Sequence, residues 1–380
     1  MCCSQSKNMR DEGAEIVFGE LSGIAALLRA FIPCGRVALI ADGEKNFSAV
    51  REIQSALKGF ESFCMVVGEK ESAIGLFSLP DDVRAAIAVG NGSFYAARYF
   101  CTLRGAYCIA VPDDAALSTA FESPVPLKVG GERSRYPADP PDAVYCDVQR
   151  MRGYAAAYGD LCLCALSSFD FEVHSVFAGG DLSSPYRRIF DRAIQLDYRE
   201  EGAFKEELLS LSSQYRLLRH KNGRRTDTEV FCALMRDKLH CDGGAAALFS
   251  YRYLCERYRH FFKSAVPRDY FVPDYPGRIH IAAAYAGEDE RALFLKNRVP
   301  TAKRTYDLAE VYRESRTVFY HKAESAAVWS ERIKSILFAL GVKAPQIDAV
   351  RAHEAFSVSA ELSDTLSVPS LMRDFGLLTQ

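Results

Sequence analysis

Between Arg36 and about Arg150, short apolar runs alternate with segments in which apolar residues recur every three or four positions. Dense apolar runs of this length are typical of buried strands, and the longer spacing is typical of amphipathic helices. The expected strands are residues 36–41, 63–67, 85–89 and 107–111. The expected helices include one with Val50, Ile53 and Leu57 on one face and one over residues 94–104. This alternation predicts an α/β fold with a parallel, doubly wound sheet.

The residues that follow these strands are the most informative ones in this half of the chain. Asp42 follows the first strand, Pro112 follows the fourth, and the third runs into the turn Gly90-Asn91-Gly92-Ser93. In a parallel sheet these carboxyl ends lie along one edge, where ligands bind. A strand, a glycine turn and a helix in succession can present backbone N–H groups to a phosphate. A tight strand-to-helix turn without a ligand explains the same pattern equally well.

A hairpin-like insert and one further strand complete the α/β half. Residues 124–129 lead into Gly130-Gly131, and the run Ala143–Asp147 follows. After about Met151 helical periodicity dominates and strand patterns nearly vanish. The expected helices there are residues 204–217, 228–239, 245–262, 306–320 and 325–340. A chain of 380 residues is long for one core. We therefore expect a Rossmann-like domain over residues 1–150 and an all-helical domain over residues 151–380.

Composition and charge favour an ordinary globular protein and argue against two classes of partner. The chain is 49% hydrophobic and 25% charged, with a net charge of −2, so neither nucleic acid nor a membrane is expected as a partner. No apolar segment reaches the length needed to span a bilayer, and the N-terminus has no apolar secretion signal. The 12 cysteines form no CxxC pair, so we expect reduced thiols in a cytoplasmic protein. The helices from Ala326 onward would serve a homo-oligomer interface as readily as a core.

The order of these landmarks resembles one enzyme superfamily. A strand ends in Asp, a later strand ends in a glycine turn with Ser, and the next ends in Val-Pro. A hairpin, a Pro-Asp-Ala-Val-x-x-Asp strand and a helical half that opens with Gly-Asp follow. Over roughly residues 36–260 this order resembles the superfamily of dehydroquinate synthase, glycerol dehydrogenase and iron-containing alcohol dehydrogenase. It is most similar to the sn-glycerol-1-phosphate dehydrogenase branch.

The resemblance implies an oxidoreductase with two cofactors. Its cofactor would be NAD or NADP, bound by Asp42 and by the turn Gly90-Asn91-Gly92-Ser93. A divalent zinc or iron ion would assist hydride transfer to or from glycerol phosphate or a related polyol phosphate. The helical half would hold the metal and the substrate.

Several residues around the glycine turn depart from the family pattern. The family turn is GGGSxxDxxK, and Gly90-Asn91-Gly92-Ser93 matches it with Asn, which tolerates positive φ, in place of the middle glycine. The family aspartate falls on Ala96 and the family lysine on Tyr99. The next motif, PTxxSTDG, has Asp113 in place of its threonine, unless a shifted register brings in Ser118-Thr119. A carboxylate at this place would repel the phosphates of a cofactor.

The helical half departs from the family at one metal ligand. In the family one Asp and two His hold the metal, which polarises the C–O bond of the substrate. Asp160 and His240 match two ligands, whereas Val230 stands at the first histidine and cannot coordinate a metal. His220 would complete the set from a different register, and Cys241-Asp242 lies close enough to substitute. Asp160 as a helix cap and His240 as a helix-end residue are the structural alternatives.

These observations leave two classes of function open. The first is an NAD(P)-dependent, metal-assisted dehydrogenase, with a dehydroquinate-synthase-like cyclase as the alternative within the same class. The second is a pseudoenzyme that keeps the fold for binding or assembly and has lost catalysis. Four departures favour it, because they fall where the family places chemistry: Ala96, Tyr99, Asp113 and Val230.

Overall fold

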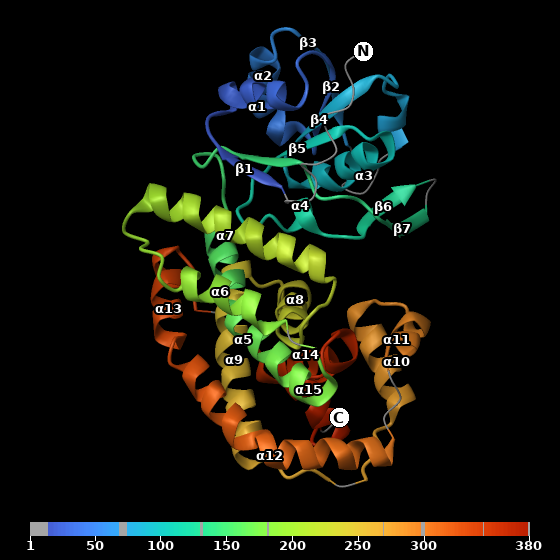
Figure 1. Ribbon diagram of the computed structural model, residues 1–380, viewed down its shortest axis with the longest axis vertical. Coiled ribbons are helices and arrows are strands. Elements are labelled where there is room, and N and C mark those ends of the chain that lie inside the picture. The colour runs from blue at the N-terminus through green and yellow to red at the C-terminus, as the bar shows by residue number, and fades with distance from the viewer. Residues whose placement is uncertain are drawn as a thin grey trace. The chain divides into compact units, whose positions relative to one another are not determined.

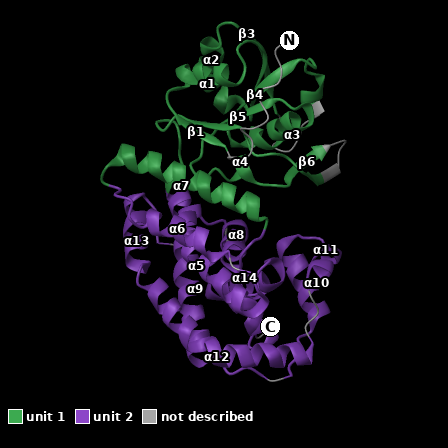
Figure 2. Ribbon diagram, viewed as in Figure 1, with its two compact units in different colours: residues 1–154, 199–223 green, residues 155–198, 224–380 purple. Residues whose placement is uncertain are grey.

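The protein divides into two compact units, which are distinguished by colour in Figure 2. The computed structural model describes residues 14–67, 74–129, 132–180, 182–268, 270–297, 301–344 and 346–378. The first unit comprises Met1–Tyr154 with Arg199–Gly223, and the second comprises Ala155–Tyr198 with Arg224–Gln380. The N-terminal segment and the Gly130-Gly131 turn, both considered in the sequence, lie outside the described residues. A segment from the middle of the chain thus folds with the N-terminal unit.

A parallel sheet of six strands forms the centre of the first unit (Figure 1). Its strands are β1 (Glu15–Phe18), β2 (Gly35–Ala41), β3 (Phe60–Val66), β4 (Val83–Val89), β5 (Tyr107–Val111) and β8 (Ala143–Cys146). The order across the sheet is β1-β8-β5-β4-β2-β3, and all neighbouring pairs are parallel. The order of winding reverses between β2 and β4. The carboxyl ends of these two strands therefore mark the place where doubly wound sheets bind ligands.

Helices cover both faces of this sheet, which confirms the predicted α/β fold. The helices of the unit are α1 (Ile24–Phe31), α2 (Phe47–Ala56), α3 (Phe94–Arg104), α4 (Ser118–Phe121) and α7 (Glu201–Asn222). Leu39 and Ile87 face α1 and α2 in one buried cluster. Because side chains alternate along a strand, Ala38 and Ala86 point to the opposite face, where α3 packs on β4 and β5. Small residues on that face let the helix approach closely.

The predicted hairpin is present as a separate two-stranded antiparallel sheet. It consists of β6 (Val125–Val129) and β7 (Glu132–Tyr136), which follow the short helix α4. The chain then returns to the main sheet as β8, as the run Ala143–Asp147 predicts.

The described residues of the second unit form helices and connecting segments, without a strand. The helices are α5 (Tyr154–Ala178), α6 (Ser183–Ala193), α8 (Asp227–Leu239), α9 (Gly243–Ser264), α10 (Tyr275–Ala286), α11 (Glu290–Lys296), α12 (Ala302–Ala327), α13 (Ser330–Ala339), α14 (Ala349–Leu362) and α15 (Val368–Asp374). The all-helical prediction for this part of the chain is therefore confirmed. One boundary differs, because the single helix expected over residues 325–340 is divided between α12 and α13 at Val328-Trp329.

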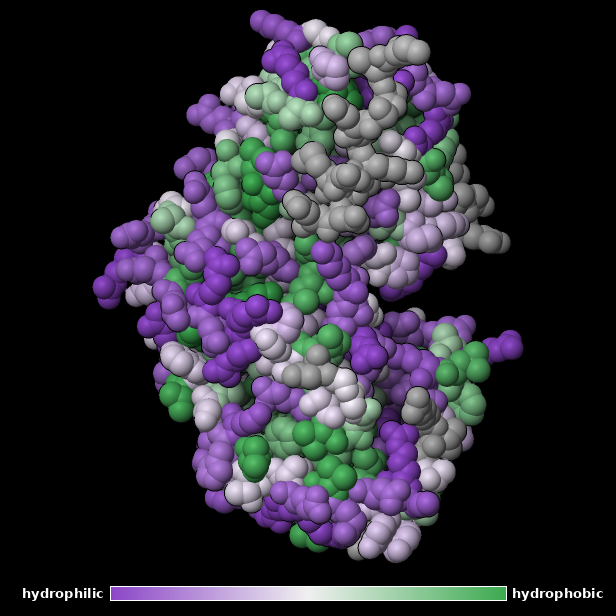
Figure 3. Space-filling model, viewed as in Figure 1, coloured by the Kyte–Doolittle hydropathy of each residue, from purple (hydrophilic) through white to green (hydrophobic). Residues whose placement is uncertain are grey.

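Helix α5 is the buried centre of the helical unit. Its residues from Ala157 to Phe171 are all buried, so other parts of the protein surround this stretch on every side. By length and composition α5 is apolar enough to cross a membrane, which corrects the expectation that no segment reaches that length. Two thirds of its apolar window is buried inside the structure, which is typical of a core helix. On the face shown in Figure 3, hydrophilic residues surround the apolar patches.

Candidate functional site

The residues expected to bind a cofactor lie together in the first unit. Asp42 directly follows β2. The turn Gly90–Ser93 follows β4 and enters α3 through a short 3₁₀ turn over Asn91–Ser93. Since β2 and β4 are hydrogen-bonded neighbours, these residues meet at the point where the winding of the sheet reverses.

Gly90 is required by both its backbone and its surroundings. Its φ is +85°, a conformation that residues with a Cβ rarely adopt. A Cβ at this position would clash with Nδ2 of Asn46 and would lie 2.6 Å from Oδ1 of Asp42. The close approach between this turn and the end of β2 therefore depends on glycine.

Asp42 accepts hydrogen bonds from the turn and from the segment after its own strand. Its Oδ2 accepts a bond of 2.8 Å from the backbone N–H of Gly92, and its Oδ1 accepts one from the side-chain amide of Asn46. Nζ of Lys45 lies 3.5 Å from Oδ2. The Asp42 side chain is only 5% exposed, so these partners determine where its charge lies.

Asp113 accepts a second N–H of the same turn. Its Oδ1 accepts a hydrogen bond of 3.1 Å from the backbone N–H of Asn91, whose side-chain oxygen in turn accepts from the N–H of Asp113 at 3.4 Å. Nζ of Lys45 donates to Oδ2 of Asp113 across 3.0 Å. This hydrogen bond raises the pKa of Lys45, so its ammonium is the permanent counter-charge between the two carboxylates.

Each backbone N–H of the 3₁₀ turn consequently has an acceptor within the protein. Asn91 donates to Asp113, Gly92 donates to Asp42, and Ser93 donates to the carbonyl oxygen of Gly90 at 3.0 Å. A phosphate-binding turn needs such N–H groups directed at its ligand. Here two carboxylates occupy the positions at which phosphate oxygens would accept.

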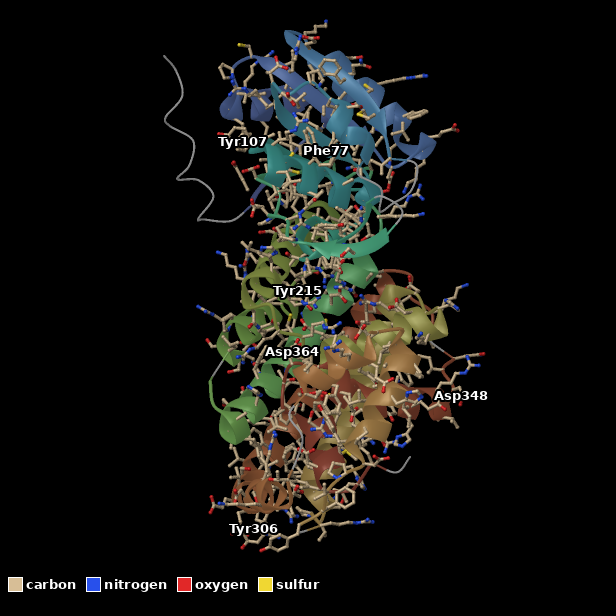
Figure 4. The ribbon with its side chains drawn as sticks, turned by 90° about the vertical axis from the view of Figure 1, so that its right-hand side faces the viewer. Phe77, Tyr107, Tyr215, Tyr306, Asp348 and Asp364 are labelled. Carbon is tan, nitrogen blue, oxygen red and sulfur yellow. The ribbon has the colours of Figure 1, made fainter. Side chains whose placement is uncertain are left out.

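Helix α3 follows the turn, and its side chains at the two positions where the family has a charged residue pack against other parts of the protein. Ala96 is fully buried. The ring of Tyr99 packs edge-on against Phe77 with centroids 6.2 Å apart, and it lies 5.0 Å from the ring of Tyr136. Phe77 is labelled in Figure 4, beside the sheet of the first unit. Neither position carries the charged side chain that the family pattern has there.

In the second unit, Asp160 is paired with a cation from the protein itself. A side-chain oxygen of Asp160, on α5, accepts a hydrogen bond from Nη2 of Arg236 on α8. The Asp160 side chain is 8% exposed and that of Arg236 is 29% exposed. This carboxylate is therefore part of a mostly buried ion pair, and it does not cap a helix.

The segment that aligns with the missing metal ligand forms the beginning of α8. Oγ1 of Thr226 accepts from the N–H of Glu229 at 3.2 Å, and Oε2 of Glu229 accepts from the N–H of Thr226 at 3.1 Å. This reciprocal arrangement is a capping box, which stabilises a helix N-terminus. Val230 follows it and is buried as a core residue.

The two histidines considered as ligands lie at helix ends. His240 is the left-handed residue that ends α8, with φ of 50°, and it is exposed. His220 lies in the last turn of α7, in the first unit, where its Nδ1 is 3.1 Å from the carbonyl oxygen of Phe121. Burial lowers the pKa of His220. Asp242, the other substitute considered, caps α9 through the N–H groups of Gly244 and Ala245.

The donors present do not fit a zinc or iron centre. The described part of the chain contains no group of three or more His, Cys, Asp or Glu side chains that could hold a metal ion. Of the residues at the family's ligand positions, Asp160 is paired with a guanidinium and Val230 is apolar. We therefore derive no chemical step through a metal.

Sequence reasoning missed Lys45 and Arg236, which are the cations of these two clusters. Lys45 lies three residues after Asp42, a spacing that places the two close together in a turn, and this signal was available. Arg236 is separated from Asp160 by 76 positions, and no local pattern links them.

A further pair of acids is buried deeper in the helical unit. Asp170 accepts hydrogen bonds from the hydroxyl of Tyr258 at 2.8 Å and from the N–H of Thr228 at 2.9 Å. Burial raises the pKa of Asp170 to about 6. Burial and then repulsion from Asp170 raise the pKa of Asp227 well above its usual range. The hydroxyl of Thr365 donates to Asp227 at 3.2 Å.

Comparison with known proteins gives similarity in structure and not in sequence. No family model and no curated protein matches the chain. Among solved structures, sulfoacetaldehyde reductase from Bifidobacterium kashiwanohense in complex with NAD+ has a TM-score of 0.52 and 11% identity, and the match covers 96% of this chain and 95% of that one. Glycerol dehydrogenase from Schizosaccharomyces pombe has a TM-score of 0.48 and 16% identity, covering 85% and 91%. Iron-containing alcohol dehydrogenase from Thermococcus thioreducens has a TM-score of 0.46 and 14% identity, and the match covers 96% of this chain and 97% of that one.

At 11% identity, the match to the sulfoacetaldehyde reductase shows a shared fold and nothing about chemistry. The reductase match extends over nearly all of both chains. It agrees with the architecture described above, a parallel α/β unit with a helical unit. The comparison thus supports the fold class that the sequence pattern predicts.

Proposed function

We propose that this chain is a non-catalytic relative of the NAD(P)-dependent, metal-assisted polyol dehydrogenases, and that it keeps their fold for binding or assembly. One observation carries the proposal. The N–H groups of Asn91 and Gly92, which a dinucleotide's phosphates would need, donate to Asp113 and Asp42.

The charges around the turn also oppose the binding of a dinucleotide. A pyrophosphate at the turn would have to displace both carboxylates and would then lie beside them. Asp42, Asp113 and Lys45 together leave one net negative charge at the turn. Two like unit charges 4 Å apart repel by about 1 kcal/mol in water and about 4 kcal/mol near a protein surface. A dinucleotide therefore loses its principal anchoring contacts and meets a repulsive field.

A second candidate is the dehydrogenase itself, acting on glycerol phosphate or a related polyol phosphate. It is favoured by the retained backbone of the turn, since Gly90 still has its positive φ and still leaves no room for a Cβ. In this case Asp113 would have to turn away when the cofactor arrives. Lys45 could then pair with a phosphate, because its side chain is 63% exposed.

A turnover assay separates the two candidates. The purified chain is mixed with NADH or NADPH and dihydroxyacetone phosphate, with zinc or ferrous iron added, and the absorbance of the reduced cofactor is followed. The proposal predicts no oxidation of cofactor above the rate without protein. Steady oxidation that requires both the substrate and the chain would overturn the proposal in favour of the dehydrogenase.

A further inference from the structure

We infer that the guanidinium of Arg236 takes the charge-neutralising place of a metal ion at Asp160. The inference concerns the second unit alone. It does not depend on the state of the glycine turn, so it can fail while the proposed function stands.

The contact is an ion pair from which solvent is largely excluded. Nη2 of Arg236 donates directly to Oδ1 of Asp160, whose side chain is 8% exposed. A carboxylate at this depth needs a partner, because an unpaired buried charge is costly. In the family that the sequence resembles, a divalent ion provides the compensating charge. Here a side chain of the same unit provides it.

The arginine is held where three helices begin or end. Arg236 lies in the last turn of α8, and Asp160 lies in the second turn of α5. A Cβ at Gly243, the first residue of α9, would be 2.6 Å from Cβ of Ala156 and 3.8 Å from Nε of Arg236. The start of α9 therefore packs closely against α5 and lies next to the arginine.

Arginine is also a permanent occupant. Its guanidinium stays protonated throughout the pH range in which proteins are stable, so it remains a cation beside Asp160. A divalent ion would have to displace the guanidinium and leave it without its counter-charge. With Val230 buried at the position of a second ligand, the incoming metal ion would gain too few donors to offset that cost.

Three variants and a matched control test the pairing. Asp160→Asn and Arg236→Met each break the pair, and the double variant removes both charges. Arg187→Met is the control, because Arg187 pairs with Asp191 on the surface of the same unit at 3.0 Å, with both side chains about half exposed. We expect each single variant to lower the melting temperature by several degrees more than the control. We expect the double variant to recover most of that loss, since neither charge is left alone.

Metal analysis of the wild-type chain provides the decisive measurement. The protein is produced in medium supplemented with zinc and iron, and its metal content is measured by mass spectrometry. We expect far less than one ion per chain, and no rise in melting temperature when zinc is added. Near-stoichiometric metal, or losses that simply add in the double variant, would overturn the inference. The metal measurement needs no variant, so it decides the matter even if the single variants do not fold.

Discussion

The carboxylate of Asp113 lies 3.1 Å from the backbone nitrogen of Asn91, and it accepts the N–H that opens the glycine turn. This contact joins the end of β5 to the end of β4. A strand, a glycine turn and a helix in succession are typical of a phosphate-binding site. In this protein the carboxylate of Asp113 occupies a position at which a phosphate oxygen would accept.

The close approach at Gly90 predicts a specific loss of stability. Gly90→Ala introduces a Cβ that clashes with Nδ2 of Asn46, at a φ of +85°. Gly59→Ala is the matched control, since its φ is +98° but nothing lies within 4 Å of the added atom. We expect about 1–2 kcal/mol from backbone strain in both variants and at least a further 1 kcal/mol at Gly90 from the displaced contacts. Urea unfolding measures the difference, and equal losses would contradict the tight contact.

Asp42 is expected to stabilise the first unit strongly. Asp42→Ala leaves the N–H of Gly92 and the amide of Asn46 without their acceptor. A hydrogen bond to a charged group contributes about 1.5–3 kcal/mol, and we expect a loss of that size. Asp82→Ala, which removes an exposed carboxylate paired with Arg36, is the control and should cost much less, because exposed ion pairs contribute little. A loss at Asp42 no larger than at Asp82 would show that the turn does not need this acceptor.

The raised pKa of Asp170 predicts that the contribution of this residue to folding stability falls as the pH rises. Its folded pKa of about 6 lies above the ordinary value of about 3.9. A raised carboxyl pKa favours the folded state fully below the ordinary value, and this contribution is lost as the pH rises through about 6. The stability cost of Asp170→Asn should therefore be largest near pH 4 and should shrink by pH 7. Unfolding of both proteins in urea across this range measures the trend, and a cost that grows with pH would contradict it.

The lowered pKa of His174 predicts that the contribution of this residue to folding stability rises with pH. Its Nδ1 accepts a hydrogen bond of 2.9 Å from the N–H of Leu366, which requires a neutral ring, and burial lowers its pKa. A lowered histidine pKa gives a contribution that is present above about 6.5 and is lost as the pH falls. His174→Ala should cost about 1–2 kcal/mol at pH 8 and less at pH 5. His321→Ala, at an exposed histidine of the same unit, is the matched control for loss of an imidazole.

The strands and the turn were predictable because their signals are local. The apolar runs at β2, β4 and β5 are continuous, as expected for strands buried on both faces. By contrast, β1 is a four-residue strand at the edge of the sheet. Glu15 is exposed and its other three residues are only partly buried, so the sequence shows no comparable apolar run there. The division between α12 and α13 was missed because helical periodicity continues across Val328-Trp329.

The contacts that decide the function were only partly predictable. The sequence placed Asp113 near the turn and predicted repulsion of a phosphate, but it did not indicate that the carboxylate would accept the turn's own N–H. That contact depends on the register of β5 beside β4. The pairing of Arg236 with Asp160 depends on how α8 packs on α5, which no local pattern encodes.

The central claim is tested most directly by titrating the chain with NADH and following the cofactor's fluorescence. Asp113→Asn removes the charge at the turn while keeping the size of the side chain, and Asp82→Asn makes the same change on the surface of the same unit. We predict no saturable binding by the wild type or by Asp82→Asn up to millimolar NADH. We predict measurable binding by Asp113→Asn. Its affinity for NADH should be at least about tenfold higher than the upper limit that the titration sets for the wild type, which corresponds to about 1.4 kcal/mol of binding free energy. Saturable micromolar binding by the wild type, unchanged in Asp113→Asn, would contradict the account.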